Sequence, residues 1–275
     1  MRQILGVALL VLVCVRPAPA QPLLEFRDDL AFSAAEVDRL AARSFGARLR
    51  TLARSGKLDT DAALKERLQS IVPRLIRAAA YERPATASLQ WEIHSCARCD
   101  ENASAMAGGK LLISADLVAR LGLGDDELAY LLAHEMAHVL AEHTREFASA
   151  ARYFVDNGLA RNYADIQHEV AESYTVMIRM QPLYVEQELS ADYIGYFLGA
   201  RAGFAPQAML SLLRKLHSTG TALVATHPSD AQRMRQAETM FESARRLYAS
   251  ASPEGRRNAW LASVGLLHAG APGPL

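Results

Sequence analysis

The chain has 275 residues, of which 51% are hydrophobic and 22% are charged, an ordinary globular composition with room for one domain and a sizeable core. Basic and acidic residues number 30 each, so the formal net charge is zero. A net charge of zero gives no electrostatic argument for binding to nucleic acid or to an anionic membrane, and we expect no nucleic-acid partner.

The first twenty residues have the layout of a secretory signal peptide. Arg2 supplies a positive charge, residues 4–15 form an apolar run, and small residues precede a cleavage site after Ala20. The apolar run is too short to span a bilayer comfortably. Cys14 is not expected to carry a lipid, because a valine precedes it where a small residue would be needed. We therefore expect residues 1–20 to be removed and residues 21–275 to be exported as one domain.

Removal of the signal peptide would leave two cysteines, Cys96 and Cys99. In an exported protein, a pair at C-x-x-C spacing is expected to form a local disulfide. A redox site would need a thioredoxin-like βαβ context, which the pattern lacks. A zinc knuckle would need a second pair of ligands, and His94 offers only one further group.

Helical periodicity dominates the first part of the exported chain. Ser33 followed by Glu36 is typical of a capping box and predicts a helix that stops at residues 55–56. A second helix is expected over residues 60–80, with Pro73 causing a kink or an interruption.

A small sheet and further helices are expected in the rest of the chain. Residues 88–94 alternate apolar and polar side chains, as a half-buried strand does, and residues 110–114 form a partner strand after a break at Gly108 and Gly109. The pattern predicts a single α+β domain that is mostly α-helical with a small β-sheet. Further helices are expected over residues 115–121, from 126 to beyond 143, from 163 to a break at Pro182, from 186, and over 206–217, 230–248 and 255–267.

The segment from His134 to His138 predicts the chemistry of the protein. Residues four apart lie on the same side of an α-helix, so both imidazoles can bind one zinc ion. Glu135 projects beside them, where it can take a proton from water. The alternative is a surface helix with two solvated histidines, but the motif lies in an apolar stretch, and buried polar groups need partners. His143, five residues after His138, would face away from the metal and is expected to be structural.

An acidic motif further along the chain can complete this metal site. Glu188 is a suitable third zinc ligand, which would leave a fourth position open. Asp192, one turn further along the helix, can accept a hydrogen bond from a zinc-bound histidine and fix its orientation. Without the upstream motif, the pair would be an ordinary solvated acidic face. Glu186 would point elsewhere on the helix.

Four segments form an ordered set that is more specific than any one of them. They are residues 102–109 with the glycine pair, the metal helix within residues 127–143, the E-x-x-A-D motif at 188–192, and A-G-F-A-P at 202–206 followed by T-H-P at 226–228 and by Arg233. Together they resemble peptidase family M48, the group of the heat-shock protease HtpX and the CAAX-prenyl proteases. The resemblance covers roughly residues 60–248 and implies one zincin domain of the gluzincin type.

The resemblance also implies a setting. The chain lacks the transmembrane helices of HtpX and the prenyl proteases and looks most like the small soluble periplasmic members. This implies unfolded or misfolded envelope proteins as substrates and a role in protein quality control. It leaves open a peripheral association with the outer membrane or its assembly machinery.

The resemblance singles out further residues near the active site. His227 is expected to line the site, where it would help to bind the transition-state oxyanion or cap the zinc in a resting form. Arg233 is expected to steady the substrate or a nearby carboxylate, with a surface salt bridge as the alternative. Residues 104–109, which include Gly108 and Gly109, are expected to form a strand edge that binds an extended peptide through its backbone.

The predicted activity is therefore zinc-dependent hydrolysis of peptide bonds by direct attack of water, with Glu135 as the general base. A non-catalytic zinc-containing envelope chaperone or adaptor is the main alternative, although such a protein has no evident need for Glu135. A zinc-stabilised structural domain is the other, and His227 would be its fourth ligand.

Overall fold

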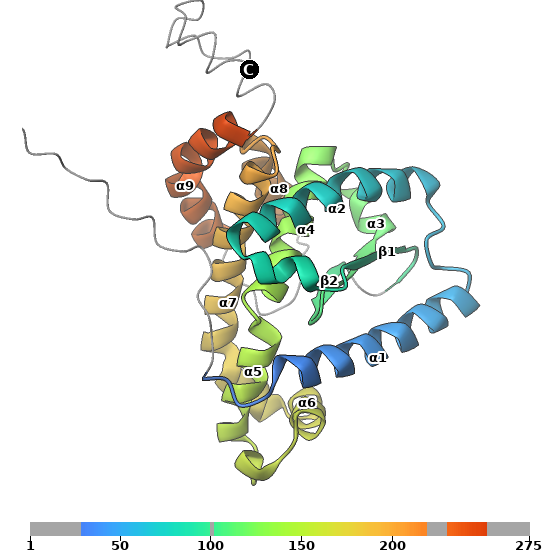
Figure 1. Cartoon of the computed structure of the whole chain (residues 1–275), viewed down its shortest axis with the longest axis vertical. Coiled ribbons are helices and arrows are strands. Elements are labelled where there is room, and N and C mark those ends of the chain that lie inside the picture. Colours follow the sequence, from blue (N-terminus) through green and yellow to red (C-terminus); the bar gives the residue numbers. More distant parts are fainter. Residues whose placement is uncertain (1–28, 100–101, 219–229, 252–275) are drawn as a thin grey trace, which may run out of the picture.

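Helices make up most of the chain, and a three-stranded sheet lies against them (Figure 1). The structure is a computed structural model that describes residues 29–99, 102–218 and 230–251. The predicted fold class, α+β and mostly helical, is confirmed. The elements in chain order are α1 (Ala34–Arg54), α2 (Ala62–Glu82), η1 (Pro84–Ser88), β1 (Glu92–Cys96), β2 (Ala103–Met106), β3 (Lys110–Ser114), α3 (Ala115–Arg120), α4 (Asp125–Leu140), α5 (His143–Ala151), η2 (Arg152–Phe154), η3 (Gly158–Ala160), α6 (Tyr163–Glu172), α7 (Tyr174–Arg201), α8 (Gln207–Ser218) and α9 (Asp230–Ala251).

The first two helices begin where polar side chains cap them. Ser33 caps α1, as predicted, and Asp61 caps α2. Of the two expected effects of Pro73, a kink or an interruption, the interruption is absent, because Pro73 lies inside the continuous helix α2. The missing N–H of Pro73 would have bonded the carbonyl of Gln69, and that residue is exposed, so water can satisfy the carbonyl. Buried residues of α2 on both sides of Pro73 pack in the core and stabilise the helix across this position.

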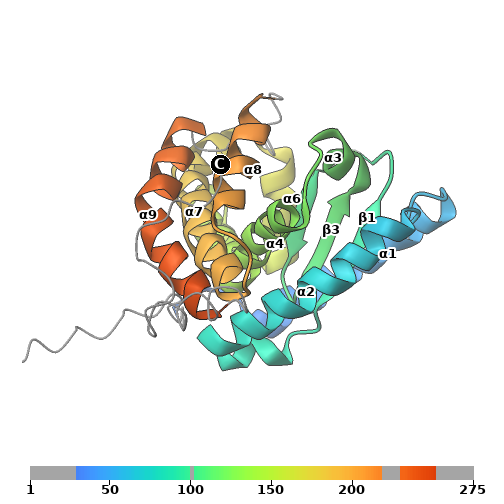
Figure 2. The same cartoon turned by 90° about the horizontal axis from the view of Figure 1, so that it is seen from above.

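The sheet has the strand order β1-β3-β2, with β1 parallel and β2 antiparallel to β3. β1 begins at Glu92, later than predicted: Ser88 belongs to the 3-10 helix at 84–88, and residues 89–91 are irregular. Leu58 bridges to Cys96 on the outer side of β1. β2 is the opposite edge of the sheet and lies next to α4, while α7 and α9 lie on the far side of α4 (Figure 2).

Helices α4 and α7 approach each other closely, and two glycines of α7 allow it. A Cβ atom on Gly195 would lie 2.8 Å from the backbone nitrogen of His134, and one on Gly199 would lie 2.4 Å from the ring of Tyr130. Neither contact is possible for a larger residue without a shift of the helices. This packing brings the second half of α7 against the H-E-x-x-H segment.

Two helical predictions are wrong in this region. The metal helix does not continue beyond His143: α4 ends at Leu140, Glu142 adopts a left-handed conformation with φ of 57°, and α5 begins at His143. Conversely, α7 runs uninterrupted through Pro182. The residue whose carbonyl Pro182 leaves without its helical partner, Ile178, lies on the exposed surface, so water can satisfy that group.

The C-terminal helices follow the prediction up to α9. The expected helices at 206–217 and 230–248 are present as α8 and α9. The expected helix at 255–267 and the predicted signal peptide at 1–20 lie outside the described residues. Of the helices in the described ranges, none is both long and apolar enough to cross a membrane.

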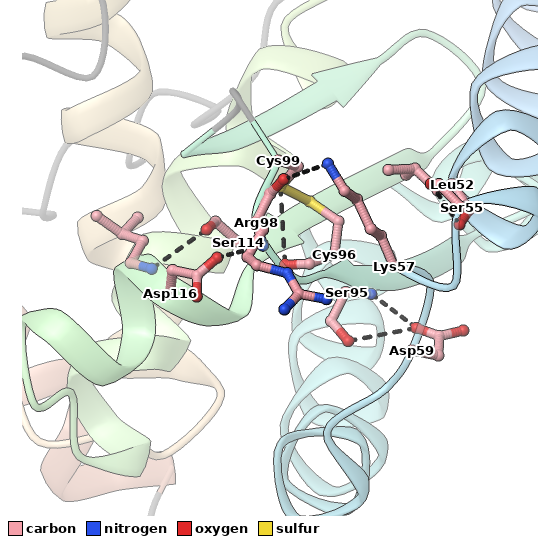
Figure 3. Close-up of a disulfide and its surroundings, with 11 residues drawn as sticks. Leu52, Ser55, Lys57, Asp59, Ser95, Cys96, Arg98, Cys99, Ser114 and Asp116 are labelled. Atoms are coloured by element: carbon pink, nitrogen blue, oxygen red, sulfur yellow. Dashed lines mark hydrogen bonds between the residues drawn. A yellow bond between two sulfur atoms is a disulfide. The ribbon is translucent and has the colours of Figure 1, made fainter.

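Cys96 and Cys99 form the predicted disulfide at the end of β1 (Figure 3). Cys96 is fully buried and packs with apolar residues of α1 and β3. The turn that the disulfide closes is held from two sides. Lys57 Nζ donates to the carbonyl of Arg98 at 2.7 Å, and the backbone N–H of Arg98 donates to Asp116 at 2.5 Å. The turn closed by the disulfide is therefore hydrogen-bonded to the α1–α2 loop and to the start of α3.

Candidate metal centre

Three side chains converge between α4 and α7. His134 and His138 project from the same face of α4, and Glu188 reaches them from α7. The two Nε2 atoms of the histidines lie 3.3 Å apart. Glu188 Oε2 lies 3.4 Å from Nε2 of His134, and Glu188 Oε1 lies 3.5 Å from Nε2 of His138. Among the described residues, this is the one group of three metal-binding side chains whose ligand atoms gather in this way.

The spacing of these atoms fits a zinc ion. Two ligand atoms that bind zinc at about 2.0–2.1 Å and subtend a tetrahedral angle lie about 3.3–3.4 Å apart. The two Nε2 atoms, 3.3 Å apart, agree with that value, and each of them lies 3.4 or 3.5 Å from a different oxygen of the Glu188 carboxylate. Two imidazole nitrogens and one carboxylate are also a donor set that zinc favours, and they leave a fourth position open. The residues present therefore fit the metal.

Asp192 supports His134 from behind. Its Oδ1 lies 3.0 Å from Nδ1 of His134, on the side of the ring away from Glu188. Arg233 of α9 forms a two-pronged ion pair with the same carboxylate, at 2.6 and 2.7 Å. Burial alone would raise the pKa of Asp192, but the charge and hydrogen bonds of Arg233 outweigh it and lower the pKa to about 2. The carboxylate is therefore charged and directs the Nε2 atom of His134 into the site.

The electrostatics of His134 show how strongly this site attracts positive charge. Burial lowers the pKa of His134, but the hydrogen bonds and charges of Asp192 and Glu188 outweigh burial and raise the pKa to about 10. Without a metal, the site would hold a proton on this ring. A divalent cation competes with that proton for the same nitrogen, so metal binding releases it.

Glu135 lies beside the three ligands and is mostly buried, with 8% of its surface exposed. Burial raises its pKa to about 7, although the nearby charge of His134 lowers it. Its side chain lines a cavity of about 290 Å³ together with His134, His138 and Glu188. The carboxylate therefore shares one space with the metal-binding atoms.

His143 contacts the site directly, although we predicted that it would face away. Its Nδ1 lies 3.0 Å from Nδ1 of His138, the ring nitrogen that does not face Glu188. The prediction assumed one continuous helix, but the break at Glu142 turns His143 back toward His138. Burial and the charge of His134 hold the pKa of His138 well below its usual value.

Gln187 is a site residue that the sequence analysis missed. It is buried beside Glu188, and its amide donates to the carbonyl of His143 at 3.0 Å and to the carboxylate of Glu146 at 2.9 Å. It thereby fastens the start of α5 to α7. The sequence signal for Gln187 was its position next to Glu188. That signal is weak, because adjacent residues of an α-helix point to different sides of it.

The site cavity opens along the edge strand of the sheet. Residues 103–105 of β2 line this cavity together with the metal-binding side chains. Phe147, Val170 and Tyr184 from α5, α6 and α7 line the remainder. A chain in extended conformation can add to an open strand edge through backbone hydrogen bonds, so this edge is suited to hold a peptide.

Gly109 and Arg233 lie away from the strand edge that borders the metal cavity, and Gly108 borders a neighbouring cavity. Gly109 lies in the turn after β2, where its carbonyl accepts from Glu92 at 2.9 Å and the ring of Trp91 covers it. Gly108, in the same turn, borders a second cavity rather than the strand edge. Arg233 does not lie at the edge strand, but it is buried against Asp192 and steadies that carboxylate, which is one of the roles that we expected for it. His227 lies outside the described residues.

Known proteins are similar to this chain in sequence. The family model described as Peptidase family M48 matches residues 62–241, more than half of the chain. The mitochondrial metalloendopeptidase OMA1 of Saccharomyces cerevisiae is 26% identical over 202 residues, covering 67% of this chain and 58% of that protein. The protein of the same name from Schizosaccharomyces pombe is 30% identical over 165 residues, covering 57% and 48% of the two chains.

A plant relative gives a similar result. The mitochondrial metalloendopeptidase OMA1 of Arabidopsis thaliana is 28% identical over 162 residues, covering 56% of this chain and 33% of that protein. The chain thus spans about half the length of the curated relatives it matches. The extent of the family match nevertheless settles its classification: the chain belongs to peptidase family M48, a family of metallopeptidases.

Proposed function

We propose that the protein is a zinc-dependent endopeptidase whose metal is held by His134, His138 and Glu188. The convergence of these three side chains, with ligand atoms 3.3–3.5 Å apart in a cavity that also contains Glu135, carries the proposal. Membership of a metallopeptidase family supports it.

Different residues of the chain have different roles in hydrolysis. When bound, the zinc ion polarises the scissile carbonyl and makes water more acidic. Glu135 accepts a proton from the attacking water on its carboxylate and passes it to the nitrogen of the departing amine. Asp192 holds His134 in orientation, while Arg233 keeps Asp192 charged. No serine or cysteine nucleophile is required.

We propose unfolded or misfolded polypeptides as the substrates. The β2 edge that borders the site cavity can hold an extended chain through backbone groups, which every peptide has. Such recognition accepts many sequences but requires a segment that is free to become extended. A folded domain does not offer one, so the enzyme would select for unfolded chains.

We place this activity outside the cytoplasm, in the cell envelope, as part of protein quality control. The signal-peptide pattern of residues 1–20 and the disulfide between Cys96 and Cys99 support this location. Fusion of residues 1–20 to a reporter enzyme that is active only after export tests it. Reporter activity that disappears when the apolar run is interrupted by charges supports export, and a reporter that stays inactive contradicts it.

Digestion of unfolded casein by the purified protein tests the enzymatic proposal. We expect cleavage that stops when a chelator removes the metal and returns when zinc is added back in slight excess. A tightly folded protein of similar size, offered under the same conditions, should remain intact. Casein cleavage that continues at full rate in the metal-free protein would show that the proposal is wrong.

A further inference from the structure

A second cavity adjoins the metal centre. It has a volume of about 170 Å³ and is distinct from the cavity that contains Glu135. The two cavities share His138 and Thr144 in their walls, so they meet at the C-terminal end of α4 and the first turn of α5. The second cavity is therefore adjacent to the metal centre.

Apolar groups form most of the surface of this cavity. They come from the first turn of α1, from η1 and the residues after it, from the turn after β2, and from the end of α4. The apolar lining residues are Ala34, Val37, Ala85, Leu89, Ala107, Val139 and Leu140. A ligand that fills this space would gain free energy by removing apolar surface from water.

The charged groups in the wall largely compensate one another. Glu142 lies between two guanidinium groups: Arg83 Nη2 is 3.0 Å from its Oε1, and Arg145 pairs with its Oε2. Arg83 also donates to the carbonyl of Leu140 at 2.8 Å. Asp38 of α1 adds a half-buried carboxylate to the wall. The cavity therefore favours an uncharged group over an acidic one.

The two cavities follow one another along the same backbone segment. Residues 103–105 of β2 border the metal cavity, and Ala107 and Gly108, immediately after β2, border the second. A peptide extended along this edge advances about 3.3–3.4 Å per residue, and alternate side chains point to the same face. Ala107 and Gly108 follow Ala105 by two and three residues, so a peptide that lies along this edge with its scissile bond beside residues 103–105 would reach the second cavity within about three residues.

We propose that this second cavity is a substrate subsite that selects a large uncharged side chain, aliphatic or aromatic, within three residues of the scissile bond. The inference rests on the proposed peptidase function. One wall, formed by α1, lies before residue 62, where the family match begins. The subsite is thus completed by a segment outside that match.

Ala85→Trp tests the subsite, because it places a large side chain in the wall from η1. Ala87→Trp is the matched control, since Ala87 is exposed on the same short helix and does not line the cavity. The substrates are peptides that differ at a single position near the cleavage site, carrying leucine, phenylalanine, alanine or aspartate. We expect kcat/KM of the unmodified protein to be at least tenfold higher for leucine and phenylalanine than for aspartate.

In Ala85→Trp, the ratio of kcat/KM for the leucine and phenylalanine peptides to kcat/KM for the alanine peptide should fall about tenfold. Ala87→Trp should keep the full preference. Ala34→Trp, which fills the cavity from α1, provides a second variant, with exposed Ala35→Trp as its control. Melting temperatures identify any variant that fails to fold. Unchanged preferences in both folded cavity variants would overturn the inference.

Peptide binding separates this inference from the enzymatic proposal. The dissociation constants of the same peptides are measured on Glu135→Gln protein, with and without Ala85→Trp. A preference for large uncharged side chains that disappears with Ala85→Trp supports the subsite even if the unmodified protein cleaves nothing. Equal binding of all four peptides, or a preference that survives Ala85→Trp, overturns the subsite even if casein is digested.

Discussion

The Nδ1 atoms of His138 and His143 lie 3.0 Å apart, although the two residues belong to different helices. The Nε2 atom of His138 faces Glu188, so Nδ1 is the ring nitrogen left for a supporting contact. His143 provides that contact on one side of the site, as Asp192 does for His134 on the other. Each histidine in the candidate ligand set is therefore held by one further residue.

Loss of this contact should weaken metal binding without unfolding the protein. Because supporting residues orient their ligands, His143→Ala is expected to reduce zinc affinity about 10–100-fold. Competition with a chromogenic chelator measures the affinity. His168→Ala, a change at an exposed histidine of α6, serves as the control and should bind zinc normally. Unchanged zinc affinity in His143→Ala would show that the contact has no positioning role.

The buried ion pair between Asp192 and Arg233 should contribute to stability. Arg233→Gln leaves the Asp192 carboxylate buried without the guanidinium, which is expected to cost about 3–5 kcal/mol of unfolding free energy. Urea denaturation of the metal-free protein measures it. Arg235→Gln, at an exposed position of α9, should cost less than about 0.5 kcal/mol. Similar losses in the two variants would contradict the importance of the pair.

The close approach of α4 and α7 predicts a large effect for a single methyl group. Gly195→Ala places a Cβ 2.8 Å from the backbone nitrogen of His134, so the helices must separate. We expect a loss of about 1–3 kcal/mol of unfolding free energy, together with weaker zinc binding. Gly46→Ala in α1 meets only the flexible end of Arg50, at 3.4 Å, and should be neutral or stabilising by up to about 1 kcal/mol. Thermal denaturation that ranks the two variants the other way would refute the argument.

The ionisation of Glu127 should make the folding stability of the protein depend on pH in the acidic range. Burial raises its pKa, but hydrogen bonds from Lys215, Ser211 and the backbone of Gly124 outweigh burial and lower the pKa below 4.5. A lowered folded-state pKa stabilises the protein above the unfolded value, and this contribution disappears as the pH falls below about 4.5. Glu127→Gln should therefore be less stable at pH 7 and lose less stability on acidification.

Urea denaturation at pH 7, 5 and 4 measures this dependence. Glu66→Gln, an exposed change in α2, should follow the unmodified protein at each pH. The same slope of stability against pH in Glu127→Gln and in the unmodified protein would rule out this contribution.

The sequence was sufficient to predict the site where local geometry determines it. The spacing of His134 and His138 guarantees that they share a helix face, and the E-x-x-A-D motif identified Glu188 and Asp192. Contacts between residues far apart in the sequence were harder to predict. Arg233 could be assigned to a carboxylate only as one of several options, because its partner lies 41 residues away in sequence. The second cavity depends on α1 lying near the end of α4, which no local pattern encodes.

The errors in secondary structure have tertiary causes. Proline normally disfavours helix interiors. Pro73 and Pro182 nevertheless lie inside helices, because other residues of these helices are buried in the core. The helix break at Glu142 is equally unexpected, because a glutamate with φ of 57° has no sequence signal. Glu142 pairs with Arg83 and Arg145, so the surrounding structure supports this conformation. That break places His143 beside the metal site.

The most direct test of the central claim compares the unmodified protein with Glu135→Gln, measuring zinc content and casein digestion on the same preparations. The account predicts one zinc ion per chain in both proteins and digestion by the unmodified protein alone, because the substitution removes the base and keeps the ligands. Digestion by Glu135→Gln at the normal rate would contradict the assigned role of Glu135. Absence of zinc from both proteins, under conditions in which a known zinc enzyme stays loaded, would contradict the metal site itself.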